Sequence, residues 1–133
     1  MPFVLDASVA ACWAFDDEDH PTAAKALERV RADEARVPAL WWFEVRNTLI
    51  VNERRGRLTE QDTSVFLRDL ARLGIVVDYA PVEASVLDIA RRHRLSVYDA
   101  SYVELALRNG ILLATLDSAL ADAAVAENLE LLG

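Results

Sequence analysis

Four acidic residues lie where the chain turns from an apolar segment into a helix, or within the first turns of one: Asp6, Glu44, Asp99 and Asp117. Asp6 directly follows Phe3-Val4-Leu5, and Asp117 comes shortly after Leu112-Leu113-Ala114-Thr115. In a parallel sheet, such positions fall at one edge, where active sites form. Ionised carboxylates that meet there repel and raise one another's pKa unless a cation neutralises them. The pattern therefore predicts a metal site.

The donor set indicates the kind of cation. Oxygen ligands without cysteine or histidine suit hard cations such as Mg²⁺ or Mn²⁺, whereas zinc usually recruits nitrogen or sulfur. We expect Cys12, in an apolar stretch, in the core, and His20 and His93, in polar sequence beside helices, on the surface. A hard cation can orient a phosphate, lower the pKa of a bound water and stabilise developing negative charge. Phosphodiester hydrolysis is the chemistry that this set favours.

These positions also have an interpretation that involves no chemistry. Asp6 and Asp117 can cap the helices that follow them, and Asp99 can form a capping box with Ser96. Ser8 can hydrogen-bond a neighbouring carboxylate or simply satisfy a backbone group. Three caps and a half-buried glutamate would nevertheless all map to one edge of the sheet, which favours a site.

Glu44 stands among bulky apolar residues, early in a predicted helix. Asn47 follows it by three residues on the same helix face, so Asn47 can hold the Glu44 carboxylate or face the same cleft. Glu104 differs, because Arg108 lies four residues later and this spacing predicts an ordinary exposed ion pair.

Short apolar segments alternate with segments of helical periodicity. Strands are expected at residues 3–5, about 36–37, 75–79, 112–115 and 129–132. Helices are expected at residues 9–15, 21–33, 40–54, 59–72, 81–92, 98–109 and 118–126. Gly56, Gly74 and Gly110 follow predicted helices, while Pro21 and Pro81 open them. Strands that alternate with helices imply a parallel sheet.

The composition bounds the class of protein. With 133 residues, 53% of them hydrophobic, the chain 1–133 fits one domain that buries roughly two thirds of its unfolded surface. A single cysteine leaves no intramolecular disulfide, and no apolar run approaches the roughly 18–20 residues that span a bilayer. We expect a soluble, cytoplasmic protein without membrane association.

The net charge of −8 argues against a general nucleic-acid coat protein, because binding along phosphates needs a basic face. Thirteen of the fourteen basic residues are nonetheless arginine, and several of these group at residues 54–57 and 91–94. Each cluster can contact phosphate in a bidentate manner or simply be a solvated helix end. The acidic run at residues 16–19 is expected to be a solvated loop, with contact to a basic partner or a cation as the alternative.

Four motifs together resemble the PIN-domain ribonucleases, and specifically the VapC-type toxins of bacterial toxin–antitoxin pairs. The motifs are Leu5-Asp6-Ala7-Ser8, Glu44-Val45-Arg46-Asn47, Tyr98-Asp99-Ala100-Ser101-Tyr102 and Ala114-Thr115-Leu116-Asp117. Each is weak evidence alone, whereas all four in this order across nearly the whole chain form a specific signal.

The resemblance implies a three-layer α/β/α sandwich with a parallel five-stranded sheet of order 3-2-1-4-5. It also implies an endoribonuclease that depends on Mg²⁺ or Mn²⁺, with Asp6, Glu44, Asp99 and Asp117 as its acidic quartet. Asp6 and Asp99 would bind the metal directly, while Glu44 and Asp117 would bind it directly or through water, or act as a base. Ser8 and Thr115 match polar positions that line the pocket.

The same resemblance implies partners. Family members cut RNA, often in tRNA or ribosomal RNA loops, which fits the preference of proteins for unpaired RNA. A cognate VapB-type antitoxin would place a basic, partly disordered tail in the acidic groove, and a homodimer would be common. Trp41, Trp42 and Phe43 are expected either to line the antitoxin groove or to pack in the core.

Other classes fit less well. An aspartate-based phosphotransferase would want a second aspartate where this chain has Ser8, and the lysine of such sites is missing because Lys25 is the only one. A response-receiver module would want a lysine at the end of its last strand, where Leu131-Leu132-Gly133 stands. A catalytically silent PIN domain that only binds RNA or a partner is the alternative, and the intact quartet argues against it.

Overall fold

The computed structural model describes residues 1–133 as four strands and seven helices. The strands are β1 Phe3–Leu5, β2 Ala35–Pro38, β3 Val76–Asp78 and β4 Leu112–Ala114. The helices are α1 Ala7–Cys12, α2 Pro21–Val30, α3 Leu40–Arg54, α4 Glu60–Ala71, α5 Glu83–His93, α6 Val97–Asn109 and α7 Ser118–Ala126. All seven predicted helices and the first four predicted strands are present, with shifts of up to three residues at their ends.

The four strands are parallel and ordered β3-β2-β1-β4, which confirms the predicted order for these four. Phe3 of β1 pairs with Ala35 of β2 on one side and with Leu112 of β4 on the other. The predicted fifth strand at 129–132 is wrong as a strand, because the segment forms only an isolated parallel bridge from Leu131 to Leu113. Leu113 exchanges two hydrogen bonds of 3.0 Å with this segment, too few for a ladder beside a strand of three residues.

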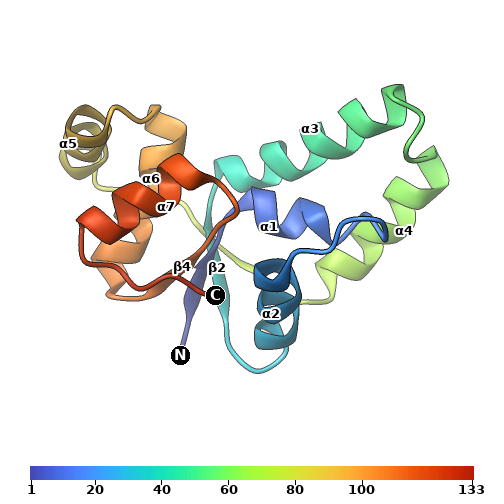
Figure 1. Cartoon of the computed structure of the whole chain (residues 1–133), viewed down its shortest axis with the longest axis horizontal. Helices are drawn as coiled ribbons and strands as arrows, with labels where there is room; N and C mark the ends of the chain where they lie inside the picture. The colour runs from blue at the N-terminus through green and yellow to red at the C-terminus, as the bar shows by residue number, and fades with distance from the viewer.

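Helices cover both faces of the sheet. Figure 1 shows α5, α6 and α7 on one side and α1 to α4 on the other, which gives the predicted three-layer α/β/α arrangement. Helix α6 packs against β1, β2 and β4, and α2 packs against β4. Because both faces are covered, β1 is a continuous apolar run whose residues Phe3, Val4 and Leu5 are fully buried.

Helix α1 begins and ends earlier than the predicted 9–15. The Asp6 carbonyl accepts the amides of Val9 and Ala10 at 3.0 and 3.3 Å, so the helix starts directly after Asp6. Around Cys12 the backbone changes to hydrogen bonds with the third residue back, which close tighter turns and end the α-helix. The early start sets the Asp6 side chain at the junction of strand and helix.

Helices α3 and α4 extend away from the sheet as a hairpin (Figure 1). Gly56 makes the turn between them with φ of +75°, a backbone conformation that other residues rarely adopt. Thr59 then starts α4 with a complete capping box, in which Asp62 is the reciprocal partner. The hairpin therefore has a defined local geometry although few of its residues are buried in the core.

Glu104 corrects one prediction. Its pairing with Arg108 is confirmed at 2.7 Å, but the glutamate is only 2% exposed and lies inside α6, not on the surface. Arg108 also donates to Asp78 at the end of β3 at 3.0 Å. The Arg108 hydrogen bond holds the pKa of Asp78 below its usual range. The pair thus joins α6 to the outermost strand, which sequence spacing on one helix does not reveal.

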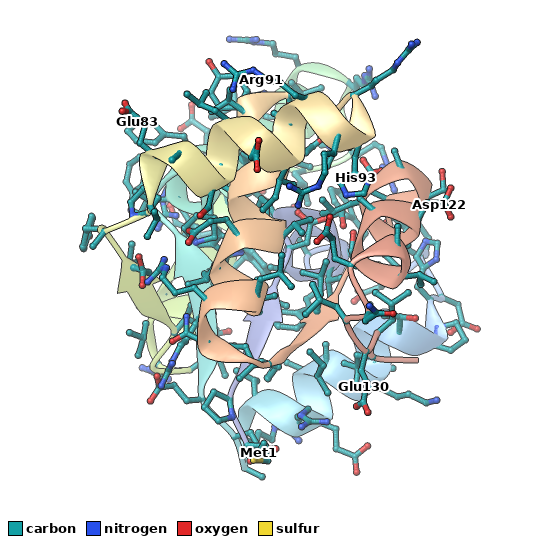
Figure 2. All side chains as sticks on the ribbon, turned by 90° about the vertical axis from the view of Figure 1, so that its left-hand side faces the viewer. Met1, Glu83, Arg91, His93, Asp122 and Glu130 are labelled. Carbon is teal, nitrogen blue, oxygen red and sulfur yellow. The ribbon has the colours of Figure 1, made fainter.

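His93 corrects a second prediction, because its side chain is only 17% exposed. Its Nε2 lies 2.6 Å from Glu127 Oε2, just beyond α7, and Arg92 donates to the same oxygen at 2.8 Å. Hydrogen bonds from His93 and then Arg92 lower the pKa of Glu127. In Figure 2, His93 lies at the end of α5 that faces α7, so the three residues tie these helices together. His20 is exposed, as predicted.

None of the seven helices combines the length and the apolar character needed to cross a bilayer.

Candidate active site

Asp6 lies at the carboxyl end of β1 and is only 6% exposed. It occupies the N-cap position of α1, but its carboxylate makes no capping hydrogen bond, so the capping interpretation is wrong for this side chain. Instead Ser8 Oγ and Thr115 Oγ1 each donate to Oδ2 at 2.7 Å. Side-chain hydrogen bonds reach only Oδ2, which leaves Oδ1 available to another ligand.

The same two hydroxyls hold the turn between β4 and α7. Ser8 Oγ accepts the Leu116 amide at 3.1 Å, and Thr115 Oγ1 accepts the Asp117 amide at 3.0 Å. Each hydroxyl therefore has its proton directed to Asp6 and a lone pair directed to a backbone N–H. The turns that follow β1 and β4, over a hundred residues apart in sequence, are locked together around Asp6.

Glu44 enters this region from the second turn of α3. Tyr102 Oη donates to Glu44 Oε1 at 2.6 Å and accepts the Ala7 amide at 3.4 Å. Tyr102 is fully buried on α6, so its hydroxyl connects this helix to the start of α1 and to Glu44 of α3. Sequence reasoning assigned no role to Tyr102. The available signal was its spacing, since it follows Asp99 by three residues and shares that helix face.

Asp99 and Asp117 lie at the first turns of α6 and α7. Asp117 is the N-cap of α7, where its Oδ1 accepts the Leu120 amide at 3.1 Å, as the capping interpretation predicted. Ser96 caps α6 by accepting the Asp99 amide at 3.0 Å. Figure 1 shows the start of α7 at the edge of the sheet where α1 and α3 also start. Capping by one oxygen of Asp117 leaves its second oxygen for other contacts.

The four carboxylates are close enough to affect one another's ionisation. Burial is the main cause that raises the pKa of Asp6, Glu44 and Asp99. The charge of Asp117 adds to the increase at Asp6, those of Asp6 and Asp99 at Glu44, and those of Asp117 and Asp6 at Asp99. No basic side chain opposes these effects. The site is a concentration of negative charge without a cationic partner from the chain itself.

This set of side chains fits a hard divalent cation. Every donor is oxygen, and the charge of a cation would offset the mutual repulsion that raises these pKa values. The one group of cysteine, histidine and carboxylate ligands that converges to within 4.8 Å lies elsewhere, around Cys12. The quartet is therefore more widely spaced, as suits an ion such as Mg²⁺ that keeps several of its waters.

Asn47 does not bond the Glu44 carboxylate, whose side-chain hydrogen bond comes from Tyr102. It does face the same cleft as Glu44, which was the other expectation. A groove of about 410 Å³ beside the carboxylates is lined by Leu40, Phe43, Glu44, Asn47 and Tyr98. Asn47 therefore lines the groove beside Glu44 without bonding its carboxylate.

The three consecutive aromatic residues of α3 separate into two environments. Trp41 is 4% exposed and belongs to the core, whereas Trp42 and Phe43 are 48% and 69% exposed. The core interpretation therefore holds for Trp41 alone.

In the arginine clusters, Arg57 pairs with Asp17 and Arg92 pairs with Asp88 and Glu127, so each cluster has a member engaged in ion pairs.

A family model of the PIN domain matches residues 3–126. The chain belongs to the PIN-domain family. It is 36% identical over 125 residues to Ribonuclease VapC3 of Pyrobaculum aerophilum, a match that covers 92% of this chain and 94% of that protein. This similarity confirms the resemblance to VapC-type PIN proteins that the four motifs indicated.

The PIN fold of this chain also recurs in solved structures. The crystal structure of PAE2754 from Pyrobaculum aerophilum superposes with a TM-score of 0.73 at 26% identity, covering 92% of this chain and 79% of that one. FitAcB from Neisseria gonorrhoeae superposes with a TM-score of 0.69 at 17% identity, covering 98% and 96%. At that identity, the second match supports the fold alone.

Proposed function

We propose that this chain, as a single PIN domain over residues 1–133, is a metal-dependent endoribonuclease and the toxin of a VapBC-type toxin–antitoxin pair that acts in the cytoplasm. The observation that carries the proposal is the uncompensated carboxylate quartet at one edge of the sheet, in a chain similar to a VapC ribonuclease. The substrate would be RNA, with tRNA or ribosomal RNA as the first candidates.

In this proposal Asp6 and Asp99 bind Mg²⁺ or Mn²⁺ directly, and Glu44 and Asp117 bind it directly, through water, or act as a base. The bound cation supplies an activated water and charge stabilisation at the phosphate. Ser8 and Thr115 hold Asp6 Oδ2, so Oδ1 would be the oxygen that binds the cation. Tyr102 holds one oxygen of Glu44, and Asn47 lines the groove beside Glu44.

Cleavage of total tRNA and ribosomal RNA by the purified protein tests this proposal. Discrete cuts are expected with Mg²⁺ or Mn²⁺, and none with EDTA or in the Asp6→Asn variant. Asp122→Asn is the matched control, because Asp122 is an exposed aspartate on α7 (Figure 2) and does not belong to the quartet. That variant should cut as the unmodified protein does.

Cleavage that survives both EDTA and Asp6→Asn would contradict the proposal and point to a contaminant. RNA binding without any cleavage would instead support the catalytically silent PIN module.

A groove of about 640 Å³ between the α1–α2 segment and the α3–α4 hairpin suits the antitoxin. Apolar side chains, among them Phe15 and Phe66, line it together with Asp16, Asp62 and Asp69. An apolar surface with acidic residues is complementary to a segment that is both apolar and basic. We place the VapB-type tail here rather than along Trp41, Trp42 and Phe43, because Trp41 is buried and the exposed Phe43 lies on the face proposed below for a second copy.

A homodimer is also part of the proposal. Phe43, Tyr79 and Tyr98 are 69%, 79% and 66% exposed, and they line two adjoining pockets that share Leu40. Monomeric proteins rarely leave so much aromatic surface uncovered in one place. A second copy of the chain would cover this face beside the catalytic residues.

A further inference from the structure

A second group of potential metal ligands lies at the opposite end of α1 from Asp6. The thiol of Cys12, a carboxylate oxygen of Glu18 and a ring nitrogen of His20 all lie within 4.8 Å of one another. Cys12 is the last residue of α1, and His20 is the N-cap of α2. The three donors therefore come from one short connection between two helices, outside the carboxylate quartet.

Their mutual distances approach those around zinc. Tetrahedral zinc with bonds of about 2.3 Å to sulfur and about 2.0–2.2 Å to nitrogen or oxygen places its ligand atoms roughly 3.3–3.8 Å apart. The three donor atoms lie no more than 4.8 Å apart, so small rotations of the side chains would bring them to that spacing. Three different protein donors and one open position are a common zinc arrangement.

The surroundings leave these donors available. The His20 side chain makes no hydrogen bond and does not cap α2. The Glu18 carboxylate contacts Arg57 only at 3.4 Å, and Arg57 has a closer partner in Asp17 at 3.1 Å. Turning Glu18 toward an ion would therefore leave Arg57 paired.

The thiol also faces negative charge. Burial, and then the Glu18 carboxylate beside it, raise the pKa of Cys12 to about 11. A cation that binds all three donors would bind the thiolate form of Cys12, so its binding would release a proton.

We infer that Cys12, Glu18 and His20 form a zinc site distinct from the carboxylate quartet. The mixed sulfur, nitrogen and oxygen donors select a borderline ion such as Zn²⁺ over Mg²⁺. An ion here fastens the end of α1 to the start of α2 and fixes the acidic segment between them. That segment contributes Asp16 and Asp17 to the groove assigned to the antitoxin, so zinc would set the shape of one groove wall.

Titration of the full chain with Co²⁺ under reducing conditions tests the site, because a thiolate ligand gives Co²⁺ an intense charge-transfer absorption. The carboxylate quartet has no sulfur and cannot produce this band. We expect one equivalent of Co²⁺ to generate it, an excess of Mg²⁺ to leave it unchanged, and Zn²⁺ to bleach it. The same titration of the Asp6→Asn variant should give the same band.

Cys12→Ser should abolish the band, but Cys12 is buried and this variant can also perturb the fold. His20→Gln is therefore the decisive variant, because His20 is exposed and unbonded. It should weaken Co²⁺ binding by more than roughly tenfold, since even changes behind a metal ligand cost that much. Asp19→Asn, at an exposed neighbouring position, is the matched control and should bind normally.

Absence of the band in the unmodified protein, or a band that His20→Gln and Glu18→Gln leave unchanged, would overturn the inference. Because the readout involves no RNA, its failure and the failure of the ribonuclease proposal are distinguishable.

Discussion

At the residue scale, hydroxyl groups fix the orientation of two carboxylates of the site by hydrogen bonding to them. Ser8 and Thr115 occupy one oxygen of Asp6, and Tyr102 occupies one oxygen of Glu44. Each such hydrogen bond lowers the pKa of its carboxylate, whereas burial raises it. The hydroxyls therefore fix the orientation of these carboxylates and reduce the free-energy cost of ionising them. Groups that orient metal ligands commonly make hydrogen bonds of this kind to them.

Tyr102→Phe tests the role of the tyrosine hydroxyl. The ring should still fill its place in the core, but Glu44 loses its 2.6 Å hydrogen bond, so its orientation relaxes and its pKa rises further. We expect RNA cleavage to slow by about tenfold at neutral pH, with a loss of unfolding free energy of about 1 kcal/mol. Single-turnover cleavage and urea denaturation measure the two effects. Tyr79→Phe, at an exposed position, should change neither.

Glu44→Gln tests the electrostatic cost of the quartet. In metal-free protein the pKa of Glu44 is raised above its ordinary value near 4.5. Ionised Glu44 thus costs stability at neutral pH, and this cost disappears as the pH falls through the raised pKa toward 4.5. The amide oxygen of the introduced glutamine can still accept from Tyr102 without the charge. The variant should be more stable by about 0.5 kcal/mol at pH 7, a value reduced for partial solvent screening.

Urea denaturation in EDTA between pH 4 and pH 8 measures this difference, which should shrink as the pH falls. Glu28→Gln, on α2 and away from the quartet, should show no such dependence. A Glu44→Gln variant that is less stable than the unmodified protein at pH 7 would contradict the argument.

At the element scale, the two turns after β1 and β4 act as one unit. Neither turn has a complete set of hydrogen bonds by itself, because the Leu116 amide needs Ser8 and the Asp6 carboxylate needs Thr115. The sheet order brings these turns together, since β1 and β4 are neighbours with Leu5 paired to Ala114. Element pairing thereby determines the geometry of a site whose residues are far apart in sequence.

Ser8→Ala tests this link between the turns. The change leaves Asp6 with one hydroxyl donor fewer and the partly buried Leu116 amide without its acceptor. We expect a loss of about 1–3 kcal/mol of unfolding free energy and faster hydrogen exchange at Leu116. Denaturation and amide exchange by NMR measure these effects. Ser64→Ala, at an exposed position on α4, is the control that should leave both unchanged.

At the scale of the whole molecule, charge and apolar surface are distributed unevenly. The net charge is −8, and the groove between the α1–α2 segment and the α3–α4 hairpin is lined by four aspartates. The exposed aromatic side chains of α3 and α6 lie on another surface, beside Glu44 of the quartet. This distribution is the basis for the proposals that a basic partner binds the acidic groove and that a second copy covers the aromatic face.

Phe43→Asp tests the proposed dimer face. The change puts a charge at a 69% exposed position that a second copy would bury, so it should convert dimers to monomers without unfolding the chain. Sedimentation velocity measures the oligomeric state, and circular dichroism checks the fold. Val125→Asp, at a 60% exposed position on α7, should leave the oligomeric state unchanged. Dimers that persist in the Phe43→Asp variant would place the interface elsewhere.

Much of this protein follows from its sequence. Apolar runs and helical periodicity predict five strands and seven helices, of which four strands and all the helices are present, because side-chain burial repeats every two or 3.6 residues and leaves a local pattern. The acidic quartet is equally visible, because an acid at the end of a strand is a local feature. The sequence does not show that residues 129–132 form no strand, since a short apolar segment has the same composition whether it forms a ladder or a single bridge.

Only the tertiary structure decided which groups contact one another. It buried Glu104 beside Arg108 and partly buried His93 beside Glu127, and it joined Arg108 to Asp78, which no local spacing indicates. It also set the Tyr102 hydroxyl against Glu44, across 58 residues of sequence. The reason is physical: a residue's type and neighbours determine what it can bond, whereas the packing of helices on the sheet determines which partner is within reach.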